Sequence, residues 1–531
     1  MANKDHTDPA RMEKIVSLCK RRGFIFQAGE LYGGLNGVWD YGPLGAELKR
    51  NLKDFWWRKT VQERDDVLGM DGSILTMEQV LVSSGHVGGF SDPMSECMLS
   101  KVRLRADQVP AQNGRIYWYS GADLLGRKID REFAVLANFP KEGRNQAEAK
   151  AFRFYFDALS PEEQEFVKKF ANDNEGLKTL KPIFDREEDV VDTTRFNPAN
   201  GSLLSEPRDF ELMFKTNMGA TGDAIAYLRP ETAQSIFVQF KNVLDSNRIK
   251  LPFGIAQIGK SFRNEINPRN YIFRSREFEQ MEIEYFCHPD DGLRLTDEWL
   301  ETRLSFYEEI GIPREKLHIN DIPDGERAFY SKKTYDIEYE FPFGVQELEG
   351  VAYRTDYDLG VHQKGAGKPL EYFDEETKQR FLPHVVEPSA GCDRTILALI
   401  CEAFDEETLT DDKGKEDVRT VLRFKPALAP VKVGIFPLLK KNEEQVRIAR
   451  GIQKSLQKWM TVSYDDGGAV GRRYRRQDEV GTPFCVTVDF ETLGEEKPEL
   501  KGTVTVRHRD SMEQERMEIS ALLPWLLERV R

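Results

Sequence analysis

The sequence predicts an α+β protein in which an antiparallel β-sheet domain is interrupted by a helical insertion and followed by a small α/β domain. Three observations support this prediction. Strand-like segments separated by turns dominate residues 210–404, which is typical of an antiparallel sheet. Residues 107–205 contain a charged segment with a helix-start pattern. After residue 425, strands and helices alternate, as they do in α/β domains.

The length and composition indicate a folded protein of several domains. The 531 residues exceed one ordinary domain, and fractions of 40% hydrophobic and 31% charged residues exclude a disordered chain. Six scattered cysteines form no C-x-x-C pair, so neither a disulfide framework nor a zinc ribbon is indicated. No apolar run could span a membrane and the polar N-terminus lacks a signal peptide core, so we expect a cytoplasmic protein.

The elements follow in order along the chain. Pro43 suits the first position of a helix, and an apolar stripe with three- and four-residue spacing runs from Leu44 to Trp56. In the insertion, Ser160 lies three residues before Glu163, which is the signature of a capping box. Residues 405–420 predict a charged connector. The last domain should contain one helix near 443–459 and a final helix from Met512.

Changes in this pattern give the expected domain boundaries. The antiparallel domain is split between residues 1–106 and 206–424, the helical insertion covers 107–205, and the α/β domain covers 425–531.

The segment Ser261–Phe286 predicts a β-hairpin whose polar face has an ordered composition. Because side chains alternate between the faces of a strand, Arg274, Phe278 and Glu282 share one face in that order. A guanidinium fork suits phosphate oxygens, an aromatic ring can stack on a base, and a carboxylate can hold an ammonium group. A hairpin with one solvated face is the simpler interpretation, but the order favours a site for a nucleotide joined to an amino compound.

Three segments resemble, in the family's order, the three motifs of class II aminoacyl-tRNA synthetases. "GVWDYGPLGAELKRNL" resembles motif 1, "FRNE" (Phe262–Glu265) followed by "RSREF" (Arg274–Phe278) resembles motif 2, and "EPSAGCDR" (Glu387–Arg394) resembles motif 3. Further segments, such as "SSGHVGGFSDP", "YLRPETAQSIF" and "EFEQMEIEYF", are similar to the glycyl-tRNA synthetase family. The resemblance covers most of the chain except about residues 107–205 and 405–422.

This resemblance implies both fold and function. The sheet domain is expected to be a class II catalytic domain and the C-terminal domain an anticodon-binding domain. The expected activity is ATP-dependent attachment of glycine to tRNA(Gly) through a glycyl-adenylate intermediate, by a homodimer built through the motif 1 region.

The resemblance also implies an ATP site with two catalytic arginines, Arg263 and Arg394. Arg263 is expected at the α-phosphate, Arg274 and Arg394 at the outer phosphates, and Glu265 and Phe278 at the adenine. Glu347 is expected to help hold ATP and its Mg²⁺. The complete expected set is Arg263, Asn264, Glu265, Phe273, Arg274, Ser275, Arg276, Glu277, Phe278, Glu347, Leu348, Gly391 and Arg394.

For glycine, the resemblance implies that Glu231, Glu282 and Ser389 bind the ammonium group, with Arg105 as a further substrate-side arginine. The expected glycine set is Arg105, Glu231, Phe278, Gln280, Glu282, Glu387, Ser389 and Gly391. Since one methyl group is worth only about 1–3 kcal/mol as an attractive contact, we expect the site to select glycine by excluding larger side chains.

Contact with tRNA is expected in the C-terminal domain, although the net charge of −14 taken alone argues weakly against nucleic-acid binding. A local basic patch can bind phosphate on an acidic protein. Candidate residues are Arg472, Arg473, Arg475 and Arg476, which surround Tyr474. A solvated helix end is the alternative interpretation of this charge run.

We expect no zinc. Many bacterial relatives carry paired cysteines of zinc-binding spacing beside the insertion, and the matching places here are Cys97, Ser100, Asn197 and Asn200. Only one of the four is a sulfur ligand, whereas a structural zinc site needs about four ligands.

Two other functions are consistent with parts of the pattern. A synthetase-like, non-catalytic nucleic-acid-binding subunit is disfavoured because Arg263, Glu265, Phe278 and Arg394 are all retained. A synthetase for another amino acid is disfavoured by the carboxylates Glu231 and Glu282 and by the glycyl-type segments.

Overall fold

The structure is a computed structural model that describes residues 7–137, 143–169, 179–410, 414, 416–495 and 497–531. The chain forms two compact units. The smaller unit is Gly88–Leu212, and the larger unit combines Met1–Val87 with Met213–Arg531.

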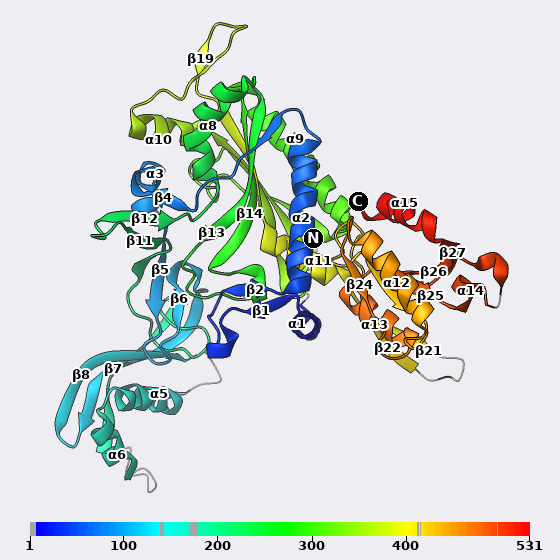
Figure 1. Ribbon diagram of the computed structural model, residues 1–531. Helices are drawn as coiled ribbons and strands as arrows, with labels where there is room; N and C mark the ends of the chain where they lie inside the picture. Colours follow the sequence, from blue (N-terminus) through cyan, green and yellow to red (C-terminus); the bar gives the residue numbers. More distant parts are fainter. Residues whose placement is uncertain (1–6, 138–142, 170–178, 411–413, 415, 496) are drawn as a thin grey trace. The chain divides into compact units, whose positions relative to one another are not determined.

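The larger unit is built around a seven-stranded sheet with the strand order β15-β16-β17-β20-β14-β13-β3 (Figure 1). Every neighbouring pair is antiparallel except β13 and β3. This confirms the antiparallel sheet predicted from residues 210–404. The strands are β3 (Val67–Gly69), β13 (Phe253–Phe262), β14 (Glu277–Cys287), β15 (Leu317–Asp321), β16 (Lys333–Phe341), β17 (Gly344–Thr355) and β20 (His384–Gly391).

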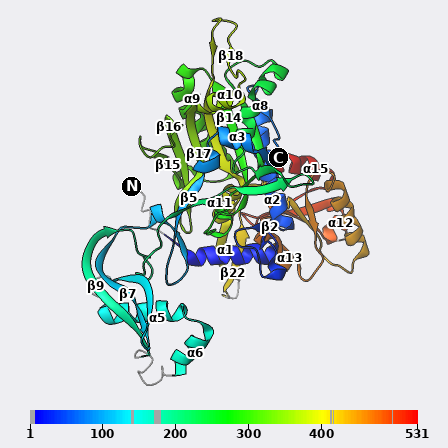
Figure 2. The same ribbon diagram turned by 90° about the vertical axis from the view of Figure 1, so that its left-hand side faces the viewer.

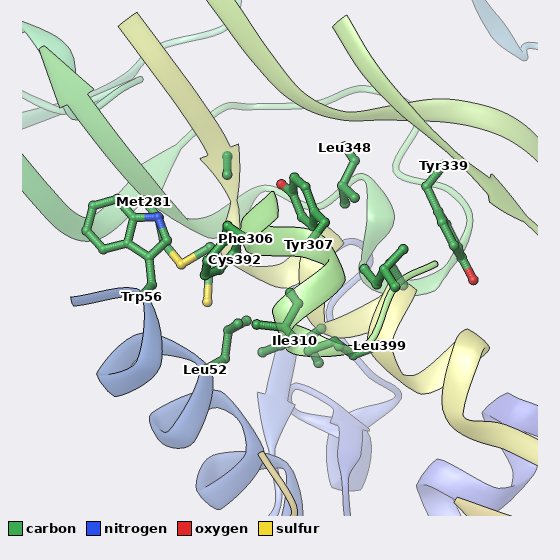
Figure 3. Close-up of a cluster of buried hydrophobic side chains, with 14 of the residues drawn as sticks. Leu52, Trp56, Met281, Phe306, Tyr307, Ile310, Tyr339, Leu348, Cys392 and Leu399 are labelled. Atoms are coloured by element: carbon green, nitrogen blue, oxygen red, sulfur yellow. The ribbon is translucent and has the colours of Figure 1, made fainter. Parts of the chain in front are cut away.

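One face of this sheet packs against α2 (Pro43–Trp57), α9 (Gly292–Ile310) and α11 (Cys392–Ala403). Figure 3 shows Trp56 of α2 close to Met281 of β14, with side chains of α9 and α11 in the same cluster. Burying each large apolar side chain contributes about 1.5–3 kcal/mol, so this cluster is the main core of the unit. The predicted stripe of α2 lies in it.

The opposite face of β14 is covered by α8 (Ala233–Asn247) and α10 (Tyr357–Ala366) at one end only. There, Phe286 packs against Phe237 and Phe240 of α8. Side chains two residues apart share a face of a strand, so the polar residues of β14 with even numbers continue this face beyond the helices.

Smaller elements complete this part of the larger unit. They are α1 (Pro9–Arg22), α3 (Glu78–Ser83), α4 (His86–Gly89, at the boundary between the units), the pairs β1 (Ile25–Gln27) with β2 (Trp39–Tyr41) and β18 (Tyr372–Phe373) with β19 (Arg380–Phe381), and the sheet of β4 (Leu75–Met77), β11 (Phe214–Met218) and β12 (Ala224–Leu228).

The charged connector predicted at residues 405–420 is instead largely an antiparallel hairpin of β21 (Phe404–Thr410) and β22 (Glu416–Leu422). Several of its described charged side chains form ion pairs. The fully buried Arg419 donates to Asp478 at 2.9 Å and to Glu407 at 2.8 Å. The charged composition therefore did not indicate β22, a strand whose inward-facing residue is an arginine.

The C-terminal part is an α/β domain, as predicted. Its five-stranded sheet has the order β24-β23-β25-β26-β27. The elements are β23 (Val433–Pro437), α12 (Glu443–Leu456), β24 (Val462–Tyr464), α13 (Val470–Val480), β25 (Phe484–Val488), α14 (Phe490–Leu493), β26 (Thr503–His508), β27 (Gln514–Glu518) and α15 (Ile519–Val530). The final helix begins at Ile519, not at Met512, because residues 514–518 pair with β26.

The smaller unit contains more β-structure than the predicted helical insertion. The helices α5 (Arg144–Asp157) and α6 (Pro161–Lys169) accompany a long three-stranded sheet in the order β8-β7-β9 (Figure 2). The strands are β7 (Gln112–Leu124), β8 (Arg127–Ala137) and β9 (Leu180–Thr193), and a second sheet pairs β10 (Arg208–Glu211), β5 (Ser91–Glu96) and β6 (Arg103–Arg105). The capping box is confirmed by reciprocal hydrogen bonds between Ser160 and Glu163.

A membrane-spanning helix, long and apolar enough to cross a bilayer, is absent from the described residues.

Candidate functional site

A cavity of about 520 Å³ lies against the polar residues of β14. It brings together most residues that the sequence predicts for ATP and glycine. These are Glu231, Arg263, Glu265, Phe273, Arg274, Ser275, Phe278, Gln280, Glu282, Glu347, Leu348, Glu387, Ser389, Gly391 and Arg394.

One region of the cavity is rich in guanidinium groups. Arg263, Arg274 and Arg394 all line it. Arg263 donates from Nε to the carbonyl of Pro230 at 3.1 Å, and its guanidinium lies 5.4 Å from the ring centre of Phe278. Arg394 donates to the carboxylate of Glu347 at 3.1 Å. Such forks suit an anion with several oxygens, such as a polyphosphate.

The row of side chains along β14 has the predicted order, with Phe278 followed by Gln280 and Glu282 on one face. Gln280 accepts a hydrogen bond from Ser261 at 2.7 Å. Glu282 accepts from the hydroxyl of Ser389 at 2.7 Å and from the hydroxyl of Thr232. Burial, and then the charge of Glu231, raise the pKa of Glu282 above its usual range. A cationic ligand beside Glu282 would favour its ionised form and so counteract both causes of the raised pKa.

Glu231 lies beside His86, with 3.4 Å between its Oε1 and Nε2 of the imidazole. Burial alone would raise the pKa of Glu231, but His86 and Arg354 outweigh it and hold the pKa below its usual range. Conversely, burial would lower the pKa of His86, but the Glu231 carboxylate outweighs it and raises the pKa. Glu231 is therefore an ionised carboxylate that a histidine partly neutralises.

Arg354 of β17 is a cavity residue that the sequence interpretation missed. It is buried, donates to both oxygens of Glu387 at 3.0 and 2.9 Å, and donates to both oxygens of Asp358 at 2.7 and 2.9 Å. Its guanidinium also lies 4.1 Å from the ring centre of Tyr330. An arginine inside an otherwise apolar strand segment was the available signal.

Asp336 of β16 is a second residue that was missed. Burial, and then the nearby carboxylates Glu347 and Glu338, raise the pKa of Asp336 to about 7. Asp336 and Glu347 both line the cavity. A buried carboxylate whose pKa is raised by a neighbouring carboxylate is also suited to hold a hard divalent cation together with that neighbour.

A half-buried lysine of α2 contacts one residue of β14 and one residue of α11 beside the cavity. Lys49 of α2 donates to Asp393 at 2.9 Å and lies 2.8 Å from the Glu279 carboxylate. Asp393 also accepts from the backbone N–H of Glu279 at 2.6 Å. Glu279 follows Phe278 and Asp393 precedes Arg394, so the three residues join α2 to two cavity-lining residues.

Four of the predicted ligand residues do not line the cavity. Asn264 lies between Arg263 and Glu265. Arg276 donates to the carbonyls of Glu265 at 2.9 Å and Asn36 at 2.7 Å, which holds the loop before β14. Glu277 forms an ion pair with Lys260. Arg105 belongs to the smaller unit, where it pairs with Asp92 at 2.9 Å and Asp107 at 2.7 Å. Their ligand roles stay predictions.

The arginines of α13 differ in what they can offer to RNA. Arg473 is buried, and its guanidinium donates to the carbonyls of Pro437 at 2.5 Å, Gly468 at 2.7 Å and Asp466 at 3.1 Å. These bonds commit Arg473 to the domain interior and argue against its contact with tRNA, which stays a prediction. Arg475 and Arg476 form ion pairs with Asp417 and Asp465, and Arg472 is exposed.

The four places compared with zinc-binding cysteines do come together in the smaller unit. The Cys97 sulfur accepts from the backbone N–H of Ser100 at 3.4 Å and lies 3.6 Å from the Asn200 amide nitrogen. Burial would raise the pKa of Cys97, but hydrogen bonds from Ser100, Asn197 and Asn200 outweigh it and lower the pKa. Amide and hydroxyl groups thus occupy the positions where zinc would need thiolates.

Comparisons with known proteins agree with this geometry. Two family models match, the tRNA synthetase class II core domain (G, H, P, S and T) over residues 214–403 and the anticodon binding domain over residues 432–529. The chain is similar to the glycine–tRNA ligases of Rhodopirellula baltica at 41% identity, Deinococcus radiodurans at 44% and Thermus thermophilus at 45%. Each comparison covers 98% of this chain and 99% of the relative.

Proposed function

Because the chain belongs to the glycine–tRNA ligase family of class II aminoacyl-tRNA synthetases, we propose that the cavity beside β14 is where glycine is activated. The protein attaches glycine to tRNA at the expense of ATP. The observation that supports the location is the order of side chains from Arg274, just before β14, to Phe278 and Glu282 within it.

In the first step, a carboxylate oxygen of glycine attacks the α-phosphorus of ATP, and the bond to pyrophosphate breaks. The product is glycyl-adenylate, a mixed anhydride. We assign Arg263 to the α-phosphate, where negative charge develops, and Arg274 and Arg394 to the departing pyrophosphate. In-line displacement of this kind needs positioning and cations rather than a protein nucleophile.

We assign the ammonium group of glycine to Glu231, Glu282 and Ser389. Two carboxylates with a hydroxyl donor at 2.7 Å from Glu282 form a polar site for one cation. Arg354 pairs with Glu387, so the buried charges around the ammonium are partly balanced. Selection among amino acids then depends on excluding larger side chains on the α-carbon.

A divalent cation, Mg²⁺ in the sequence prediction, fits Glu347 with Asp336. Glu347 is half-exposed and carries an ion pair with Arg394, whereas Asp336 is more deeply placed and has the raised pKa. When bound with ATP, Mg²⁺ neutralises charge on the phosphate oxygens.

In the second step, a hydroxyl of the terminal tRNA ribose attacks the glycyl carbonyl, and the bond to AMP breaks. The C-terminal domain is expected to hold the anticodon, and Arg472, Arg475 and Arg476 stay candidates for its phosphates. A homodimer and a cytoplasmic location are also proposed from the sequence. Leu31 and Tyr32, in the segment between β1 and β2, are 89% and 92% exposed, which supports an interaction surface there.

The deciding experiment is ATP–pyrophosphate exchange with each of the twenty amino acids. We expect exchange with glycine and none of comparable rate with alanine or serine. Exchange with no amino acid, or preferentially with another one, would contradict the proposal. In single-turnover assays, Arg263→Ala is expected to slow adenylate formation by about 10²–10³-fold, as loss of one oxyanion-stabilising group does.

A further inference from the structure

The segment between β15 and β16 forms one wall of the cavity. Ile322, Arg327, Ala328 and Tyr330 all line it. Phe329 lies between two of these residues in the sequence, yet its side chain is 81% exposed. An exposed phenylalanine next to a reaction site needs an explanation, because large apolar side chains are normally buried.

The ring of Phe329 is held by two other rings. It meets Tyr330 edge-on at 5.2 Å and 76°, and Tyr357 edge-on at 5.1 Å and 83°. Tyr330 is in turn beneath the guanidinium of Arg354, at 4.1 Å. A series of contacts therefore runs from the amino-acid end of the cavity to this exposed ring.

The backbone of the segment is also anchored. Arg327 donates to the carbonyl of Ile322 at 2.7 Å, the backbone N–H of Lys332 donates to Tyr353 at 2.9 Å, and Ser331 bonds to Thr334 at 2.7 Å. The exposed ring is thus presented in one orientation. An ordered aromatic ring with most of its surface accessible is the arrangement that single-stranded nucleic acids use for base stacking.

Transfer of glycine requires a second nucleotide at this cavity. Phe278 is the cavity ring assigned to the adenine of ATP, and adenylate still occupies that place when tRNA arrives. A base of the tRNA end must therefore find another surface near the cavity entrance while its ribose reaches inside. Lys332, three residues after Phe329, is exposed and adds a positive charge suited to a backbone phosphate.

We propose that Phe329 is a tRNA-binding residue on which a base of the single-stranded acceptor end stacks while the terminal ribose reaches the glycyl-adenylate. The assignment rests on the proposed function of the cavity. It separates the two steps of the reaction: Phe329 acts in transfer to tRNA and not in adenylate formation. Stacking on one aromatic ring typically contributes roughly 5- to 150-fold in affinity.

The test compares Phe329→Ala, Phe329→Leu and Phe329→Trp in two assays. In glycine-dependent ATP–pyrophosphate exchange without tRNA, all three are expected to match the unsubstituted enzyme within about twofold. In charging of tRNA, Ala and Leu are expected to raise KM for tRNA roughly tenfold, consistent with loss of one stacked base, whereas Trp restores it. Phe373→Ala is the matched control, since Phe373 of β18 is exposed and does not line the cavity.

Unchanged charging by both Ala and Leu variants would overturn the proposal. Equal losses in exchange and charging would also overturn it, because they would show that the segment closes over glycine or ATP instead. Thermal unfolding of each variant separates loss of folding from loss of binding. Failure of the proposed function is distinguishable, since it would appear as absent glycine exchange in the unsubstituted enzyme.

Discussion

Glu282 and Glu284 lie two residues apart on one face of β14, and the same substitution should affect them very differently. Both side chains are buried. Glu282 accepts hydrogen bonds from Ser389 at 2.7 Å and from Thr232, and it lines the cavity. Neither carboxylate oxygen of Glu284 has a hydrogen-bond partner among the residues that the structure describes. Burial, and then the charges of Glu387 and Glu282, raise the pKa of Glu284 well above its usual range.

The magnitude follows from the charge state of each residue. Glu282→Gln removes the carboxylate that we assign to the glycine ammonium, and losing one partner of a buried charge pair costs about 2–5 kcal/mol. That is roughly a 30- to 5,000-fold loss in kcat/KM for glycine. The raised pKa of Glu284 favours its neutral form, and Glu284→Gln replaces that form by another neutral group of the same shape. We expect a change below about threefold for Glu284→Gln.

The assay is ATP–pyrophosphate exchange over a range of glycine concentrations, with both variants checked for folding by circular dichroism. The raised pKa of Glu284 means that its neutral form stabilises the fold at low pH and that this stability is lost as pH rises toward the folded pKa. The Glu284→Gln variant should lack this loss of folding stability with rising pH. Equal damage from both substitutions would refute the assignment of a neutral Glu284, and an unaffected Glu282→Gln enzyme would refute the ammonium site.

Three further predictions concern the divalent cation, the core and zinc. The rate of ATP–pyrophosphate exchange at limiting Mg²⁺ should rise with pH through about 7, because Asp336 must lose its proton to bind the cation. Asp336→Asn should flatten this pH profile. An unchanged profile would exclude Asp336 as a ligand of the cation. Glu349→Gln should lower the free energy of unfolding by about 3–5 kcal/mol, measured in urea, because it leaves the buried Arg303 without its 2.6 Å charge partner. The exposed Glu298→Gln should cost less than about 1 kcal/mol, and equal effects would contradict this difference. The purified protein should contain less than stoichiometric zinc by metal analysis. A variant with thiols at three further places should take up one zinc per chain; its substitutions are Ser100→Cys, Asn197→Cys and Asn200→Cys.

Sequence patterns correctly predicted the elements in which the order of side chains within one segment decides which of them face the core. The alternation in β14 separated the core residue Met281 from the cavity residues Phe278 and Glu282, and the structure has the same division. In the smaller unit the alternation was obscured. Arg115 of β7 pairs with Asp189 of β9 at 2.7 Å, so strand surfaces rich in paired charges resembled a charged helical segment.

The missed and misplaced site residues depend on contacts between distant segments. Arg354 gains its place from Glu387, 33 positions away in the sequence, and Asp336 from the neighbouring strand that carries Glu347. A run of arginines gives no information about burial, so Arg473 could not be separated from Arg472 before the packing of α13 was known. In these cases the sequence shows which charged side chain is present, whereas its location in the fold became known only from the tertiary structure.

The contact of Lys49 with Glu279 and Asp393 has a consequence for how assembly and activity are related. One helix contacts both the strand residue after Phe278, which we propose to stack on adenine, and the helix residue before Arg394, which we propose to bind phosphate. A displacement of α2 by even a fraction of a hydrogen-bond length would therefore misalign both halves of the nucleotide at once. If a second copy of the chain supports α2, separation of the copies should inactivate the enzyme without unfolding it. Assembly of the two copies would then control the alignment of ATP through the ammonium group of Lys49.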